Sequence, residues 1–379
     1  MVLEEYLNSK PLYYDKIDYN TIELAWKKLE PHIKLPYVIH IVGTNGKGST
    51  GRYLASFLHQ LGKNTLHYSS PHIIKFNERI WINGVDSGDE QLDSAHEKLQ
   101  NILDEELKNH LTYFEYTTLI AILLSDSFDY IVLEAGLGGE FDATNVVKNN
   151  LSLFTTIGLD HTEFLGETIE EIAETKMRSC DENFIVGKQV CKIEVAQTKD
   201  KVLKDKNEIS FVSDITLPSE ASNLPIYLKN NMRLALSAMQ FLNLEIKDFN
   251  VPKLFGRCEQ IASNITIDVG HNSLAASVIL REFIKKQSVI DGKKVNLIFN
   301  SYKDKDYNAT LMILKPIIKK VSIIQITNDI RIASVEDIQK ACSNLAIEYD
   351  TFYQIKDNED YLVFGSFKVV EEFLKRYKG

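Results

Sequence analysis

The chain has 379 residues, of which 44% are hydrophobic and 25% charged, the balance of an ordinary globular protein. At about 150 residues per domain this length predicts two or three domains. The formal net charge of −10 argues against a protein whose main task is to bind nucleic acid.

We expect no membrane span, because no apolar run reaches about 18 residues. We also expect no signal peptide, because the N-terminus is acidic and rich in tyrosine. None of the four cysteines has C-x-x-C spacing, so we expect no disulfide framework and no cysteine metal site, and a reducing cytoplasm fits.

The first strong pattern is a strand, a glycine-rich turn and a helix. The run "YVIHIV" (37–42) is typical of a buried strand, and "STGRYLASFLHQLG" (49–62) has apolar residues at helical spacing. Between them, backbone N–H groups and the positive end of the helix dipole predict a phosphate site. Lys47 adds a charge for the phosphates, and the Ser49 hydroxyl can reach a magnesium ion.

This turn departs from the usual phosphate-binding pattern G-x-x-x-x-G-K-[ST]. Ile41 stands where the first glycine is expected, and Gly48 separates Lys47 from Ser49. The chemistry survives a shortened loop, because the glycines need only let the backbone approach the phosphates. The alternative is a tight strand-to-helix turn with an incidental lysine.

Two more strands are predicted, "DYIVLEAG" (129–136) and "LSLFTTIGLD" (151–160). Glu134 ends the first, and His161 follows the second. Alternating strands and helices imply a parallel sheet covered on both faces, and parallel strands place their carboxyl ends at one edge. Ser49, Glu134 and His161 can therefore converge as magnesium ligands beside phosphates. A plain turn and a structural histidine are the alternatives.

The rest of the chain predicts a helix at 168–179, opened by the capping-box pair Thr168 and Glu171, and another at 230–246. The strand-helix pattern weakens from about 190 to 225, where the highly charged run 191–210 is predicted to be peripheral. After a connection containing Pro252 and Gly256, the strand-helix alternation restarts with "ITIDVG", "VNLIFN", "VSIIQI" and "YLVFGS". We therefore expect an α/β fold with a nucleotide-binding domain at 1–253 and a smaller Rossmann-like α/β domain at 254–379.

Eight segments occur in the same order as in folylpolyglutamate synthases, from about residue 15 to the C-terminus. They are "GTNGKGST", "YSSPHIIKFNERIWING", "LTYFEYTTL", "LEAGLGGEFDATNVV", "TTIGLDHTEFLGETIEEIAETK", "IDVGHN", "YKDKD" and "FGSF". The chain thus resembles this family, whose bacterial members often also act as dihydrofolate synthases. The family lies in the Mur ligase superfamily, whose shortened loop G-T-x-G-K-x-[ST] matches this one.

The resemblance implies an amide ligation in which ATP phosphorylates a carboxylate and the amino group of L-glutamate attacks the acyl phosphate. The implied substrates are ATP, L-glutamate, dihydropteroate and folates. The implied cofactors are two Mg²⁺ ions, with K⁺ as a further candidate. A cytoplasmic monomer that binds neither nucleic acid nor membrane is expected.

The motif match also implies residue roles. Catalytic roles fall to Lys47, His161, Lys176 and His271, with His271 facing the γ-phosphate or acyl phosphate. The implied ATP contacts are Thr44, Asn45, Gly46, Lys47, Gly48, Ser49, Thr50, Asn231, Arg257 and Asp268. The implied metal ligands are Ser49, Ser70, Glu134, His161 and Lys176, the last of these carbamylated. The chain reads "ETKMRSC" where the family usually reads "EKAGI", so the alternative for Lys176 is a solvated helix lysine.

A pterin site is implied by two segments, Thr112, Tyr113, Phe114 and Glu115, and Phe141, Asp142 and Ala143. An aromatic ring can stack on a pterin, and a carboxylate can accept its amino hydrogens. Phe114 could equally be core. Ser366 is implied as a glutamate contact, and Asn300 stands where the family commonly has glycine.

Three other functions remain open. The chain could be a folylpolyglutamate synthase alone or a Mur-type cell-wall amino-acid ligase, although "SSPHIIKFNERI" and "TYFE" are features of the folate branch. It could also belong to another class, as a nucleotide-dependent switch or transporter ATPase. The inserted Gly48 and the "IDVGHN" segment argue against that class.

Overall fold

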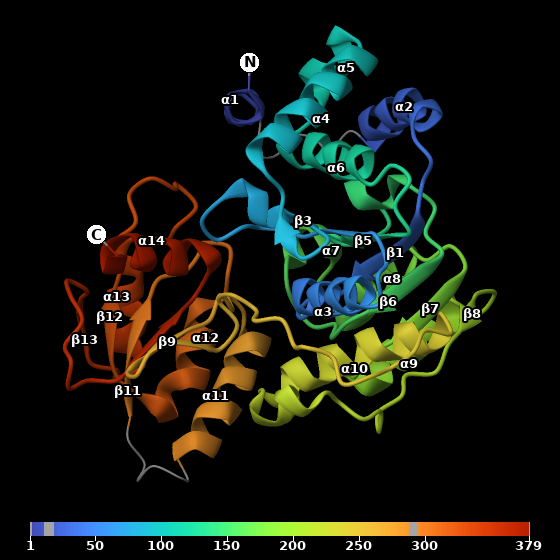
Figure 1. The fold of residues 1–379 in the computed structure, drawn as a ribbon. Coiled ribbons are helices and arrows are strands. Elements are labelled where there is room, and N and C mark those ends of the chain that lie inside the picture. Colours follow the sequence, from blue (N-terminus) through green and yellow to red (C-terminus); the bar gives the residue numbers. More distant parts are fainter. Residues whose placement is uncertain (1, 11–18, 288–293, 379) are drawn as a thin grey trace. The chain divides into compact units, whose positions relative to one another are not determined.

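The computed structural model describes residues 2–10, 19–287 and 294–378. The chain divides into two compact units, Met1–Pro252 and Lys253–Gly379, one residue from the boundary that we expect from the sequence (Figure 1). Among the described helices, none is long and apolar enough to cross a membrane.

The first unit is built on an eight-stranded sheet with the order β4-β3-β2-β5-β1-β6-β7-β8. Strands β2, β5, β1, β6, β7 and β8 run parallel, whereas β3 and β4 pair antiparallel at one edge. The mostly parallel sheet expected from the sequence is therefore confirmed. The strands are β1 (Tyr37–Val42), β2 (Thr65–Tyr68), β3 (Ile80–Ile82), β4 (Val85–Asp86), β5 (Tyr130–Glu134), β6 (Leu151–Phe154), β7 (Asn183–Val186) and β8 (Asn207–Glu208).

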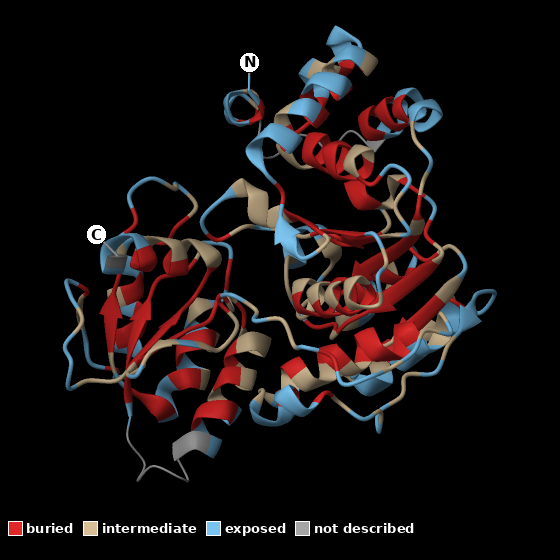
Figure 2. Ribbon diagram, viewed as in Figure 1, coloured by how far each residue is buried: buried red, intermediate tan, exposed pale blue. Residues whose placement is uncertain are grey.

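Helices cover both faces of this sheet. Figure 1 shows α2, α4 and α6 on one side and α3 and α10 on the other. The central strands are buried, as β1 and β5 illustrate, whereas the short strands β4 and β8 are exposed (Figure 2). The helices are α1 (Leu3–Asn8), α2 (Tyr19–Leu29), α3 (Lys47–Gln60), α4 (Asp89–Ile102), α5 (Glu105–His110), α6 (Tyr113–Leu124), α7 (Thr162–Leu165), α8 (Ile169–Met177), α9 (Lys192–Val202) and α10 (Ile226–Phe241), with 3-10 turns η1 (Glu30–His32), η2 (Phe76–Arg79), η3 (Ala143–Val146) and η4 (Ser219–Asn223).

Two predicted elements of this unit have different bounds in the structure. The strand expected at 151–160 ends at Phe154, because the carbonyl of Thr156 accepts N–H bonds from Thr44 and Asn45 instead of continuing the ladder. The helix expected at 230–246 begins four residues earlier, after Pro225, and ends at Phe241, shortly before Asn243 adopts a left-handed backbone with φ of 54°. The capping box of α8 is confirmed.

The second unit contains a six-stranded sheet with the order β13-β12-β11-β14-β10-β9, in which only the pair β9–β10 is antiparallel. The four strands predicted here are present. The elements are β9 (Glu259–Ala262), β10 (Ile265–Ile267), α11 (Ser273–Gln287), β11 (Val295–Phe299), α12 (Tyr307–Leu314), η5 (Lys315–Ile317), β12 (Ile318–Ile323), α13 (Val335–Asn344), β13 (Tyr349–Thr351), β14 (Tyr361–Phe364) and α14 (Phe367–Lys378).

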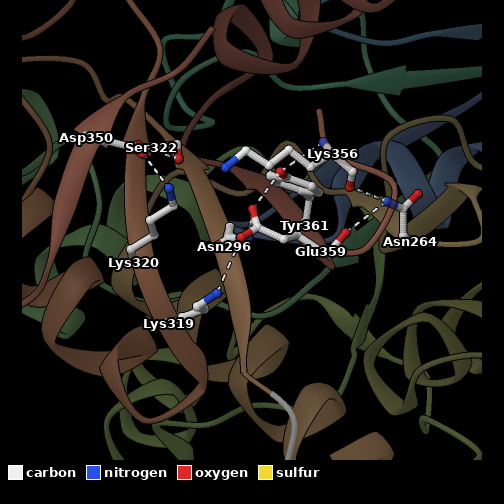
Figure 3. Close-up of polar contacts among 9 residues, drawn as sticks. All are labelled: Asn264, Asn296, Lys319, Lys320, Ser322, Asp350, Lys356, Glu359 and Tyr361. Atoms are coloured by element: carbon white, nitrogen blue, oxygen red, sulfur yellow. Dashed lines mark hydrogen bonds and ion pairs between the residues drawn. The ribbon is translucent and has the colours of Figure 1, made fainter. Parts of the chain in front are cut away.

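A polar network ties the amino ends of these strands together (Figure 3). Oε2 of Glu359 accepts bonds of 3.0 Å from Nδ2 of Asn296 and from the hydroxyl of Tyr361, and its Oε1 lies 3.4 Å from Nζ of Lys319. Burial would raise the pKa of Glu359, but the bond from Tyr361 and the charge of Lys319 hold it below its usual value. The network joins the amino ends of β11, β12 and β14, whereas the motif residues of this unit follow the carboxyl ends of its strands.

Candidate active site

The loop after β1 needs its glycines for close packing. Gly46 precedes α3 with a left-handed φ of 96°, which glycine adopts at little cost, and an added Cβ would lie 2.7 Å from Oδ1 of Asn231. At Gly43 a Cβ would lie 1.9 Å from Oγ1 of Thr155. Asn231 is buried, and its Nδ2 has no hydrogen-bond partner among the described residues. A buried amide donor therefore lies against the glycine loop.

The same loop is bonded to the chain that follows β6. The N–H groups of Thr44 and Asn45 donate to the carbonyl of Thr156 at 2.9 and 3.1 Å. The Thr44 hydroxyl donates to the carbonyl of Gly158 at 3.0 Å and accepts from its N–H at 3.1 Å. These bonds fix the loop ahead of the first turn of α3, whose N–H groups have no acceptor within the helix. The loop therefore has the form of an anion site.

Lys47 begins α3 and folds back over this loop. Its Nζ lies 3.1 Å from the carbonyl oxygen of Gly43 and 3.4 Å from that of Thr44. Burial raises the pKa of Asp142 and lowers that of Lys176, and the charge of Lys47 acts to lower the pKa of both groups. Lys47 is thus within electrostatic reach of the loop after β5 and of α8, as the convergence of strand ends predicts.

Glu134 lies at the carboxyl end of β5 and is only 6% exposed. Its Oε2 accepts the backbone N–H of Ser70 at 3.2 Å. The same oxygen would lie 3.0 Å from a Cβ placed on Gly48. Glu134, Ser70 and the first turn of α3 are therefore brought together, and Gly48, which breaks the usual pattern, leaves room for the carboxylate.

Lys176 is buried in α8, with 4% of its surface exposed, so the solvated-lysine alternative is wrong. Burial, together with the charge of Lys47, lowers the pKa of Lys176 to about 7, against the opposing influence of Asp160 and Asp142. The amine is therefore largely neutral in mildly basic solution, and the neutral form is the one that adds CO₂ to give a carbamate.

His161 lies at the start of α7, in a left-handed backbone conformation with φ of 49°. The backbone N–H of His161 donates to Oδ1 of Asp160 at 3.0 Å. Asp160 in turn acts on Lys176 by raising its pKa. His161 follows β6 on the same side of the sheet as the glycine loop after β1.

Within the described part of the chain, no three His, Cys, Asp or Glu side chains cluster as a metal site. The predicted ligand set does not require such a cluster, because Ser49 and Ser70 would supply hydroxyl oxygens and Lys176 would supply an acidic oxygen after carbamylation. Oxygen atoms make up all of this donor set except the imidazole of His161, and oxygen is the ligand that Mg²⁺ prefers.

Two of the residues matched to the pterin site cap a helix. The N–H of Thr112 donates to Oε2 of Glu115 at 2.9 Å, and the N–H of Glu115 donates to Oγ1 of Thr112 at 3.3 Å, which closes the capping box of α6. Tyr113 is half-buried under the guanidinium of Arg79, at 5.1 Å from ring centre to Cζ. Phe114 packs against Gly136, where a Cβ would lie 2.7 Å from its ring.

The three residues of "FDA" differ in exposure. Phe141 is 55% exposed, whereas Asp142 is 8% exposed and Ala143 belongs to the core. Asp142 accepts N–H bonds from Leu137 at 2.8 Å and from Thr144 at 3.0 Å, so it holds the glycine-rich loop and caps η3. Burial raises its pKa against these bonds. Phe141 is the side chain of this set that presents an aromatic surface to solvent.

In the second unit, Asp268 follows β10 and accepts N–H bonds from Gly270 at 2.7 Å and Cys258 at 2.8 Å. The guanidinium of Arg257 lies over the ring of Phe367, 5.1 Å from its centre. Nδ1 of His271 lies 3.3 Å from the carbonyl oxygen of Val269. These residues therefore cluster around the turns that join β10 to α11 and precede α14.

Ser366 and Asn300 have structural bonds. Ser366 is fully buried and directly precedes α14, where its hydroxyl accepts the N–H of Val369 at 3.1 Å. Its contact with glutamate stays a prediction. The side chain of Asn300 donates to the carbonyl of Ile324 at 2.9 Å and accepts the N–H of Ser301 at 2.7 Å. The change from glycine at this position is thus accommodated by side-chain bonds.

Sequence reasoning did not predict three polar residues near the site, the buried His40 and His67 and the partly buried Arg52. His40 in β1 contacts the hydroxyl of Thr144 at 2.8 Å, His67 in β2 lies beneath α3, and Arg52 extends from α3 toward β3 and β4. The sequence does contain a signal for the two buried histidines, because each is a polar residue that interrupts an apolar strand run. It was weak for Arg52, since a charged residue in an amphipathic helix usually indicates the solvent face.

Comparison with known proteins agrees with this geometry. The family model of the Mur ligase middle domain matches residues 41–212. A Haemophilus influenzae dihydrofolate synthase/folylpolyglutamate synthase is 30% identical across 95% of each chain, and its Bacillus subtilis counterpart is 28% identical across 89% of this chain and 90% of its own. The crystal structure of Helicobacter pylori folylpolyglutamate synthetase aligns with a TM-score of 0.78 and 36% identity, covering 99% of this chain and 98% of that one.

A second structure, E. coli FolC in complex with DHPP and ADP, aligns with a TM-score of 0.80 and 25% identity, covering 98% of this chain and 95% of that one. Similarity of sequence and of fold thus extends over nearly the whole length. The chain belongs to the dihydrofolate synthase/folylpolyglutamate synthase family of the Mur ligase superfamily.

Proposed function

We propose that this chain is an ATP-dependent ligase that joins L-glutamate through an amide bond to dihydropteroate and to folates. The observation that carries the proposal is the convergence of Lys47, Glu134 and the buried Lys176 around one sheet edge in a member of this family. The names of the relatives, which state both activities, support the choice of acceptors.

The reaction needs ATP because a carboxylate is a poor electrophile and its oxygen is a poor leaving group. A carboxylate oxygen of the acceptor attacks the γ-phosphorus, ADP departs, and an acyl phosphate forms. The amino group of glutamate then attacks the acyl carbon, loses a proton, and expels phosphate with its bonding electrons. In both steps the protein mainly positions the reactants and offsets negative charge.

The residues of the first unit suit these tasks. The N–H groups at the start of α3, with Lys47, would hold the β- and γ-phosphates, and the buried amide of Asn231 can donate to the nucleotide. Ser49, Ser70 and Glu134 would hold one Mg²⁺, and His161 and carbamylated Lys176 a second, with K⁺ as a further candidate. Bound Mg²⁺ would neutralise the crowded charges of the carboxylate and the γ-phosphate.

The acceptor and the remaining contacts are assigned by motif. Exposed Phe141 offers a ring for stacking on a pterin, and the DHPP bound to the E. coli relative supports a pterin site in the family. Arg257, Asp268 and His271 would contact the nucleotide or the acyl phosphate, and Ser366 the glutamate. We also expect a cytoplasmic monomer.

The narrower alternative is a folylpolyglutamate synthase without dihydrofolate synthase activity. It is favoured by one observation, the name of the Helicobacter pylori structure, which is 36% identical to this chain and is described as a folylpolyglutamate synthetase. The choice of acceptor in the test below separates the two candidates.

The test is ADP release in the presence of Mg²⁺, with L-glutamate plus either dihydropteroate or tetrahydrofolate. We expect release with each acceptor, and none when the acceptor or glutamate is left out. Release with tetrahydrofolate alone would select the narrower candidate. Release that depends on neither acceptor would contradict a ligase and indicate a nucleotide switch.

A further inference from the structure

Arg52 connects the nucleotide-loop helix to the segment that follows β2. It lies in the second turn of α3, and its side chain is only 21% exposed. Its Nη1 lies 3.6 Å from Oδ1 of Asp86 in β4, and its Nη2 lies 3.5 Å from the carbonyl oxygen of Glu78 in η2. Its guanidinium also lies over the ring of Trp81 in β3, 5.2 Å from the ring centre. One side chain thus touches three elements on the far side of β2.

The segment that Arg52 reaches is held together by its own hydrogen bonds. The Glu78 carboxylate accepts the N–H groups of Ile73, Ile74 and Lys75 at 2.7, 2.8 and 2.8 Å. The N–H of Ser69 donates to the carbonyl of Arg79 at 2.8 Å and closes the base of the loop. Residues 69–79 therefore form one closed loop, which we call the Ser69–Arg79 loop, and it should move as a body.

This loop also bonds to the Glu134 carboxylate. The N–H of Ser70, next to the base of the loop, donates to Oε2 of Glu134 at 3.2 Å. Burial lowers the pKa of Arg52, whereas the charges of Asp86, Glu78 and Glu134 raise it. The guanidinium and the Glu134 carboxylate are therefore close enough to interact electrostatically. Arg52 and Ser70 thus hold the loop to α3 at one place and to Glu134 at another.

We propose that Arg52 is a positioning residue for ligation: it fixes the Ser69–Arg79 loop on α3, so that Ser70 and Glu134 keep their orientation toward the first turn of that helix. This inference rests on the proposed function, because Ser70 and Glu134 are the residues assigned there to Mg²⁺. Arg52 itself is not expected to touch substrate. Its planar guanidinium can stack on Trp81 and bond to Asp86 at the same time, which a lysine cannot do as well.

The test compares Arg52→Gln and Arg52→Lys with the wild type in the full-length protein. Partners that orient metal ligands typically contribute about 10- to 100-fold to metal affinity or activity. We therefore expect Arg52→Gln to lower kcat by about 10-fold or more and to raise the Mg²⁺ concentration for half-maximal rate by a similar factor. Affinity for ADP measured without metal should change by less than about 3-fold, and Arg52→Lys should recover part of the loss.

Arg376→Gln is the matched control, because Arg376 in α14 likewise bonds a carboxylate, that of Glu372, and a backbone carbonyl, that of Gln325. It should leave both kcat and the Mg²⁺ dependence unchanged.

Folding of each variant is followed by thermal unfolding. If Arg52→Gln does not fold, Asp86→Asn removes the charge of the ion-pair partner and should itself lower kcat by about 3-fold or more.

A folded Arg52→Gln enzyme with wild-type kcat and Mg²⁺ dependence would overturn the proposal, as would unchanged values in Asp86→Asn if that variant has to be used. Mn²⁺ binding can be titrated directly by electron paramagnetic resonance, without any ligation. This measurement therefore tests the positioning role separately from the proposed function. If the wild type catalyses no ligation, the proposed function fails, whereas weaker Mn²⁺ binding in Arg52→Gln would still support the positioning role.

Discussion

Gly51 and His67 are in direct contact: a Cβ on Gly51 would lie 2.2 Å from Nε2 of His67. His67 lies in β2 and is buried, and burial, with the charge of Arg52, lowers its pKa far below the ordinary value, so the ring is neutral. The third glycine of the "GKGSTG" stretch is therefore needed so that α3 can approach the sheet, which places the nucleotide loop over the strand ends.

Replacing Gly51 by alanine should destabilise the protein by about 1–3 kcal/mol, because the added methyl group overpacks the contact with His67. In an open helix the same change would stabilise by up to about 1 kcal/mol. Urea unfolding measures the difference. The control is Gly88→Ala, where nothing lies within 4 Å of the added Cβ and the change should cost less than about 1 kcal/mol. Additive effects of Gly51→Ala and His67→Ala in the double variant would show that the two residues do not interact.

Lys47→Ala and Glu134→Ala should each lower the rate of ADP release by at least about 100-fold, because each removes charge stabilisation from the phosphates or their metal. Both residues end strands or begin helices at the sheet edge, so the fold should persist, as checked by circular dichroism. Lys34→Ala, at an exposed site before β1, is the control and should retain full activity. Near wild-type turnover in either site variant would remove the proposed phosphate and metal roles.

The pKa of Lys176 predicts how its replacement changes stability with pH. The native lysine loses its proton near pH 7, whereas an unfolded lysine keeps it to about pH 10.4. Between these values the unfolded state binds more protons, so this residue makes stability rise with pH by at most about 1.4 kcal/mol per unit. Lys176→Met should therefore be more stable than the wild type, most of all below pH 7, and the difference should shrink toward pH 9. Urea unfolding in CO₂-free buffers would show this, and a difference independent of pH would contradict it.

Carbamylation of Lys176 is tested by chemical rescue. A carbamate supplies a negative oxygen, whereas the cationic lysine would repel a metal ion, and at ~4 Å with an effective dielectric near 20 a unit charge pair is worth about 4 kcal/mol. Lys176→Ala should lose most activity and regain part of it when a short carboxylic acid is supplied. Wild-type enzyme freed of CO₂ should recover on addition of bicarbonate. An unmodified Lys176 side chain pointing away from His161, in crystals grown with bicarbonate and ATP, would be incompatible with this role.

Asp142→Ala should have two effects. Loss of the cap of η3 and of the bond from Leu137 should lower stability by about 1–2 kcal/mol. Ligation to dihydropteroate should also fall more than ligation to tetrahydrofolate, if the carboxylate accepts the pterin's amino hydrogens. Asp104→Ala is the control, because Asp104 caps α5 by accepting the N–H of Leu107 at 3.0 Å, and it should affect both acceptors equally. Equal loss with both acceptors in Asp142→Ala would argue against a dedicated pterin contact.

Much of the fold could be predicted from the sequence, because local patterns carry it. The apolar run of β1, the helical spacing of α3 and the capping pair Thr168 and Glu171 depend on residues close together in the chain. The placement of Glu134 and His161 at one edge followed from a general property of parallel sheets. The predicted end of β6 was wrong by several residues. The carbonyl of Thr156 bonds instead to a loop that lies more than 100 residues earlier in the sequence.

The sequence by itself determined the fold class, the order of the elements and the form of the glycine loop that we propose as the phosphate site, since these depend on periodicity and on the φ that glycine allows. Only the tertiary structure decided that Lys176 is buried, that Gly48 faces Glu134, and that Arg52 reaches across β2 to Asp86. The physical reason is that burial and the field around a charged group are set by neighbours from distant parts of the chain. A lysine or arginine in an amphipathic helix has the same local sequence pattern whether it faces water or a carboxylate from a distant part of the chain.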